Sequence, residues 1–142
     1  LEVPFEGGVQ LVDVAVEDST VRAGEVVKVR LTWQAPEMDS GGGAGLPNGA
    51  LVGFVHLLAG ESGSGNVAQQ DRVLLDLRRP ERSPLLPGQT KPQGYGLQAP
   101  EDIPPGSYPL IAGLYLADTG QRLRRADGSP DDFLYLTNIV VE

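Results

Sequence analysis

The stretch of sequence that decides the fold is PPGSYPLIAGLYLADTGQRL, which runs from Pro104 to Leu123. Its opening Pro-Pro-Gly does not propagate a helix and indicates a turn. Tyr108 to Leu116 is apolar almost throughout, as expected for a strand that is covered on both faces. Asp118 to Gly120 then reverses the chain, because glycine adopts positive φ without steric cost. A returning strand begins near Arg122, so the stretch predicts a β-hairpin in an all-β domain.

Other segments show the period of two that half-buried strands require. Val26 to Gln34 alternates cleanly, and its apolar face carries Trp33, the only tryptophan of the chain, which we expect to anchor the core. Val9 to Glu17 alternates in the same way. Leu51 to Ala59 is apolar on both faces, which is typical of a central strand.

The remaining strands are shorter or less regular. Val67 to Leu77 predicts one or two short strands with an interruption near Asp71-Arg72, and residues 78–92 are irregular because four prolines fall there. Further strands are expected around Tyr95 to Ala99 and from Phe133 to Val141. Together these segments predict an all-β fold, a two-sheet antiparallel immunoglobulin-like sandwich of seven to nine strands. A closed barrel is the alternative.

Length and composition limit the organisation of the protein. The 142 residues are expected to form a single domain, residues 1–142, and the chain has no cysteine, which excludes thiol chemistry and disulfides. Gly-rich segments near 39–50 and 60–66 predict flexible loops. Because the first residue is Leu1 and not methionine, we expect the chain to be excised from a longer protein.

The net charge of −8 argues against a nucleic-acid surface and against docking on anionic lipid. No apolar run reaches the roughly 18–20 residues of a membrane span, so this segment is not expected to insert into a membrane.

His56 is the only histidine, and it lies in the apolar central strand. With no cysteine and one histidine, only carboxylates remain to complete a metal site, and no nucleophile elbow is present for a triad. We interpret His56 as a structural side chain that pairs across strands, with Asp71 as its partner. No catalytic residue, metal site or cofactor is predicted.

Carboxylate pairs such as Asp71 with Asp76, or Glu101 with Asp102, are available for glycoside hydrolysis, but no spacing favours it. Asp127 to Asp132 (DGSPDD) lacks the EF-hand pattern and is interpreted as a solvated turn; a loose calcium site there is the alternative. Among the tyrosines, Tyr115 and Tyr95 are the candidate ligand-binding residues, because an exposed tyrosine on a sheet face stacks well against a sugar ring.

The order of motifs resembles that of a known domain family. LTWQAP (31–36), GFVHLLAG (53–60), AQQD (68–71) and the stretch from Pro104 to Leu123 are similar to domains that follow the many-helix membrane part of bacterial dolichyl-phosphate-mannose mannosyltransferase-like glycosyltransferases. The matching residues are Trp33, Phe54, His56, Asp71, Pro105, Gly106, Tyr108, Gly113, Leu114, Tyr115, Gly120 and Arg122. Leu86 departs from the pattern, which often has tryptophan there, and both Gly-rich loops look like insertions.

The resemblance implies an extracytoplasmic β-sandwich that is tethered to a bacterial membrane through its parent protein. The hypothesis is therefore a non-catalytic accessory or recognition domain of a membrane glycosyltransferase-like protein, which contacts a glycan or polypeptide acceptor or the membrane part of its own chain. The alternative is a free-standing carbohydrate-binding module with an exposed aromatic platform at Tyr115 or Tyr95. A hydrolase that uses Asp71 and a second carboxylate is a third hypothesis. His56, Asp71 and Trp33 are expected to hold the sandwich together.

Overall fold

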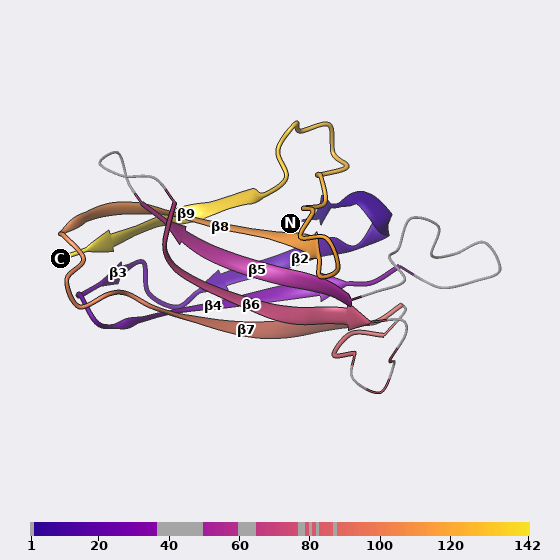
Figure 1. Ribbon diagram of the computed structural model, residues 1–142, viewed down its shortest axis with the longest axis horizontal. Helices are drawn as coiled ribbons and strands as arrows, with labels where there is room; N and C mark the ends of the chain where they lie inside the picture. Colours follow the sequence, from indigo (N-terminus) through magenta and orange to yellow (C-terminus); the bar gives the residue numbers. More distant parts are fainter. Residues whose placement is uncertain are drawn as a thin grey trace.

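A computed structural model describes residues 2–36, 50–59, 65–76, 79, 81, 83–86 and 88–142. These residues form nine strands and one short 3-10 turn, Glu6–Gly8 (Figure 1). The strands are β1 (Val3–Pro4), β2 (Gln10–Val16), β3 (Thr20–Val21), β4 (Val26–Gln34), β5 (Ala50–Leu58), β6 (Asn66–Asp76), β7 (Thr90–Gln98), β8 (Gly106–Leu116) and β9 (Leu134–Val141).

The strands make two separate sheets, which confirms the predicted immunoglobulin-like sandwich and excludes the closed barrel. One sheet has four strands in the order β1-β2-β4-β7, and the other has five in the order β3-β9-β8-β5-β6. All neighbouring strands are antiparallel except β3 and β9, which are parallel. Figure 1 shows β5, β6 and β8 in front of β2 and β4.

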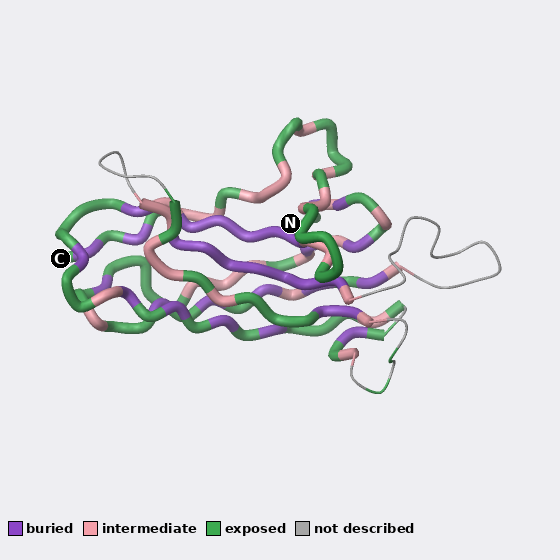
Figure 2. The backbone as a smooth tube through the Cα atoms, viewed as in Figure 1, coloured by how far each residue is buried: buried purple, intermediate pink, exposed green. Residues whose placement is uncertain are grey.

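The core lies between the two sheets and follows the alternation in the sequence. Trp33 is fully buried on β4, and its ring packs 6.1 Å from that of Phe5. On β5 and β8 the buried residues continue along most of each strand (Figure 2). The inner-facing members of those two strands belong to the core cluster, namely Leu51, Val55, Leu57, Leu110, Ala112 and Leu114.

The prediction for β6 was wrong, because this strand runs without interruption through Asp71-Arg72. Successive side chains of a strand point to opposite faces, so both charges are accommodated on this edge strand. Asp71 accepts a hydrogen bond from Tyr115 on the outer face, and Arg72 donates to the carbonyl of Gly94 on β7. The two-residue strands β1 and β3 were not predicted, since they are too short to show periodicity.

Side chains of β6 join the open edges of the two sheets. Arg72 Nη1 donates to Gly94 O at 2.6 Å, and Gln70 Oε1 accepts from the Gly96 amide at 2.6 Å. From β7, Gln93 Nε2 donates to Val73 O at 3.0 Å. An unpaired strand edge invites pairing with another chain, so these bonds protect β7 as well as holding the sheets in register.

Two further predictions concern the Gly-rich loops and the segment that follows β8. The loops expected near 39–50 and 60–66 lie almost entirely outside the described residues. The chain reverses after β8 as expected, but no strand forms near Arg122, which makes only an isolated antiparallel bridge with Tyr115. Within the described part of the chain, no helix has the length and apolar character needed to cross a membrane.

Gly53 provides a test of the packing between the sheets. A Cβ atom at Gly53 would lie 2.5 Å from the Tyr95 hydroxyl oxygen, whereas one at Gly94 would meet nothing within 4 Å. We therefore expect Gly53→Ala to lower the free energy of unfolding by about 1–3 kcal/mol through overpacking. Gly94→Ala is the matched control and should not destabilise the protein. Urea denaturation measures both, and equal stabilities would contradict this account of the core.

Candidate functional site

Five residues that carry the resemblance noted in the sequence gather on the outer face of the five-stranded sheet, away from the core. We call Phe54, His56, Asp71, Tyr115 and Arg122 the outer cluster. Phe54 and His56 are on β5, and Phe54 lies opposite Asp71 of β6 on one side and opposite Gly113 of β8 on the other. Tyr115 lies two residues beyond Gly113, so it points to the same face.

Phe54 is the base of this cluster and is fully buried although it faces away from the core. Its ring occupies the space above Gly113, where a Cβ atom would lie 2.5 Å from the ring. The Arg122 guanidinium covers the ring at 4.6 Å from its centroid, and Arg122 Nη1 lies 3.6 Å from an Asp132 carboxylate oxygen. The connection between β8 and β9 therefore folds back over the sheet and supplies the cover.

His56 packs beside Phe54, with 4.5 Å between the ring centroids. Its Nε2 lies 3.4 Å from Asp71 Oδ1, so Asp71 is the neighbour of His56 as expected, but the two side chains make no hydrogen bond. Both ring nitrogens are buried and make no hydrogen bond within the described residues. Burial lowers the pKa of His56 from its usual 6.5 and outweighs the opposing effect of the Asp71 carboxylate. His56 is therefore neutral at pH 7.

Asp71 links His56 to Tyr115. The Tyr115 hydroxyl donates to Asp71 Oδ2 at 2.8 Å, and the Tyr115 ring lies 6.2 Å from that of Phe54. Burial, together with the Asp71 carboxylate, raises the pKa of Tyr115 to about 12, so the phenol keeps its proton. The result is a partly exposed carboxylate on the edge strand β6, held in one orientation beside the central strand β5.

The structure separates the other candidate residues from this cluster. Trp33 lies in the core, as expected. Tyr95 is only 3% exposed, and its hydroxyl donates to Gln93 between the sheets. The expectation that Tyr95 offers an exposed platform is therefore wrong, whereas Tyr115 is half-buried on the outer face.

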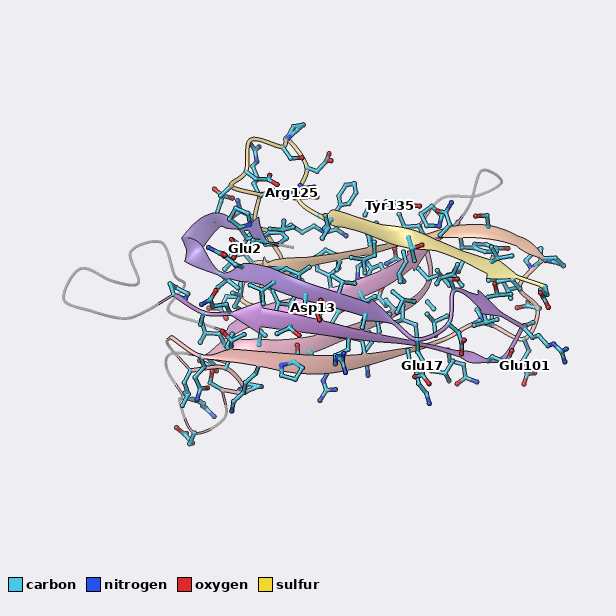
Figure 3. All side chains as sticks on the ribbon, turned by 180° about the vertical axis from the view of Figure 1, so that it is seen from behind. Glu2, Asp13, Glu17, Glu101, Arg125 and Tyr135 are labelled. Carbon is cyan, nitrogen blue, oxygen red and sulfur yellow. The ribbon has the colours of Figure 1, made fainter. Side chains whose placement is uncertain are left out.

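A further aromatic residue on the same sheet is exposed, Tyr135. Tyr135 of β9 lies opposite Ile111 of β8 and is 52% exposed, and Figure 3 shows it projecting from β9. The residues on either side of it, Leu134 and Leu136, pack against the core. That alternation is the signal that would have placed Tyr135 on the outer face.

Within the described chain, no group of three or more His, Asp or Glu side chains comes together that could hold a metal ion. In the DGSPDD turn, Asp127 Oδ2 binds Arg125 Nη2 at 2.6 Å, and Asp127 Oδ1 accepts from the Ser129 amide. Hydrogen bonding to Arg125 lowers the pKa of Asp127. The turn is thus organised by its own side chains.

No protein-family model and no curated protein sequence matches the chain. A solved structure, the crystal structure of a Niemann-Pick type C2 protein from Japanese carpenter ant, is similar in fold with a TM-score of 0.47. The two are 7% identical in sequence, and the similarity covers 100% of this chain and 94% of the other.

His56 makes the stability of the protein depend on pH. Because the folded state lowers the pKa of His56, the unfolded chain binds a proton more readily as the pH falls below about 6.5. The free energy of unfolding should therefore decrease from pH 7 towards about pH 5, before most carboxylates titrate. We expect His56→Gln to lose this component. Urea denaturation at several pH values measures the unfolding free energy of both proteins. If this free energy falls equally between pH 7 and about pH 5 in the wild type and in His56→Gln, His56 is not the source of the pH dependence.

The Tyr115–Asp71 hydrogen bond has a matched control on the same sheet. Tyr115→Phe removes the donor to Asp71 and should cost about 0.5–1.5 kcal/mol of unfolding free energy. Tyr135→Phe removes a surface hydrogen bond to Asn138 (2.9 Å) and should change stability by less than about 0.5 kcal/mol. Thermal denaturation measures the stability of both variants. A larger loss for Tyr135→Phe than for Tyr115→Phe would contradict a stabilising Tyr115–Asp71 hydrogen bond.

Proposed function

We propose that this chain is a non-catalytic, extracytoplasmic accessory domain of a bacterial membrane glycosyltransferase-like protein, and that the outer cluster recognises its glycan acceptor. One observation carries the proposal. Residues of the family resemblance that come from separate parts of the sequence gather on one outer face of the sandwich, namely Phe54, His56, Asp71, Gly113, Tyr115 and Arg122.

The arrangement of these groups suits recognition of sugar hydroxyls. The Asp71 and Arg122 side chains are 27% and 35% exposed, and they present a carboxylate acceptor and guanidinium donors. Asp71 is oriented by Tyr115, and Arg122 by its contacts with Phe54 and Asp132. Because these contacts fix the groups before a ligand arrives, binding requires little further ordering of side chains.

The same geometry argues against catalysis by the cluster. A general acid or base must lie within hydrogen-bond reach of the substrate, and both nitrogens of His56 are buried beneath its neighbours. Among the described residues, no group of three or more side chains comes together that could hold a metal ion for activating a water molecule. In this proposal, transfer chemistry belongs to the membrane part of the parent protein, as the resemblance implies.

The alternative, a free-standing carbohydrate-binding module, is favoured by one specific feature. Tyr135 is 52% exposed on the same sheet as Tyr115, and two aromatic residues on a flat sheet face provide stacking positions for sugar rings. The two hypotheses differ in the parent polypeptide. The accessory domain requires several apolar runs of about 20 residues elsewhere in the chain, and the free module requires none.

Nuclear magnetic resonance titration of the isotope-labelled domain with mannotriose tests recognition directly. We expect shifts in the amides of β5, β6 and β8 around the outer cluster. Asp71→Asn, which keeps the shape and the acceptor for Tyr115 but removes the charge, should weaken binding about tenfold. Asp13→Asn is the control, because Asp13 is an exposed carboxylate on β2 of the other sheet (Figure 3).

Three outcomes would contradict the proposal. If mannotriose shifts no amide of the outer cluster, the cluster does not recognise this glycan. If the isolated domain transfers mannose from a lipid-linked donor, the domain is catalytic. Equal weakening by Asp71→Asn and Asp13→Asn would mean that overall charge, and not the outer cluster, governs binding.

A further inference from the structure

A second surface lies on the outer face of the four-stranded sheet, on the opposite side of the sandwich from the outer cluster. It is a shallow depression of about 720 Å³, lined by residues of β2, β4 and β7 and by Arg72 of β6. This volume is within the range of about 300–1,000 Å³ that is usual for small-molecule sites. Figure 3 shows this side of the molecule, with Glu17 at the end of β2.

Two positions on the floor of the depression, Gly94 and Gly96, carry no side chain. Gly94 and Gly96 are exposed positions of β7, where the intervening Tyr95 points into the core. Neither glycine has positive φ, and a Cβ atom at Gly94 would meet nothing within 4 Å. Glycine weakens a strand, and neither conformation nor packing requires it at position 94. What the two glycines provide is a flat surface that a ligand can approach closely.

Three cationic side chains surround this floor. Arg30 lies opposite Gly94 in the register of β4 and β7, and Lys28 lies opposite Gly96. Arg72 enters from the other sheet and donates to the Gly94 carbonyl. Glu17 is the one carboxylate that lines the depression. The side chains of Lys28 and Arg30 make no ion pair or hydrogen bond with described residues, although the whole chain carries a net charge of −8.

We propose that this depression binds an acidic saccharide, a sugar that carries carboxylate groups. The apolar face of a sugar ring packs on the bare backbone of Gly94 and Gly96. Lys28 and Arg30 neutralise the carboxylate, and guanidinium groups pair with carboxylates in a favourable planar geometry. Glu17 accepts hydrogen bonds from ring hydroxyls. This site is independent of the outer cluster and does not rest on the function proposed for it.

The surroundings favour a saccharide over an anionic membrane. The lining carries the basic side chains of Lys28, Arg30 and Arg72 together with Glu17, which is fewer basic residues than the clusters of about 4–8 that dock on anionic lipid. Among large apolar residues, only Val26 is both exposed and part of the lining. A saccharide needs only a flat floor and a few placed charges, which is what the depression offers.

Calorimetric titration with trigalacturonate tests the proposal. We expect binding that weakens as salt is added, because exposed charges are screened. Arg30→Gln and Lys28→Gln should each weaken binding about tenfold. Arg22→Gln is the matched control, since it removes the same charge from an exposed turn outside the depression. Gly94→Val should abolish binding by filling the floor, with an unchanged melting temperature.

Other outcomes would overturn the proposal. Equal weakening by Arg22→Gln, or binding of inorganic phosphate as tightly as trigalacturonate, would show general anion attraction only. Binding to phosphatidylglycerol vesicles but not to trigalacturonate would assign the surface to a membrane. Binding that survives Gly94→Val in the folded protein would place the ligand elsewhere. Asp71 does not line the depression, so Asp71→Asn should leave trigalacturonate binding unchanged. The two proposed sites can therefore be tested separately.

Discussion

The structure depends on covering β5 on both of its faces. The inner side chains of β5 meet the core, but Phe54 faces outward and would be in water if nothing lay above it. Gly113 leaves room for its ring, and Arg122 closes over it. The path of the β8–β9 connection therefore follows from the need to bury one aromatic side chain, and the same requirement brings together the charged groups of the outer cluster.

The edge strand β6 connects the two faces of the sandwich. Asp71 points outward and belongs to the outer cluster, whereas its neighbour Arg72 points to the other sheet and lines the depression. Because the side-chain period of a strand is two, a slip of one residue would exchange these roles. The bonds from Gln70 and Arg72 to β7 hold this register, so both candidate sites depend on the contacts that close the edge of the sandwich.

Much of the fold was predictable, because a period of two is visible within single strands such as β4. Parity also placed Tyr115 on the outer face, and the same argument applied to Tyr95, which shares its parity with Leu97, would have placed it in the core. Contacts between strands were harder to predict. The charges of Asp71-Arg72 suggested a break because their partners lie in distant segments. The depression arises only when Arg30 pairs with Gly94, a register that neither strand reveals alone.

The two surfaces differ in whether their charged side chains have partners. In the outer cluster His56 is neutral, Tyr115 donates to Asp71, and Arg122 lies near Asp132, so each charge has a neighbour that offsets it. In the depression, Lys28 and Arg30 make no ion pair with described residues, although Glu17 lines the same surface. The depression is therefore arranged for a negatively charged ligand, whereas the outer cluster is arranged for hydrogen bonding.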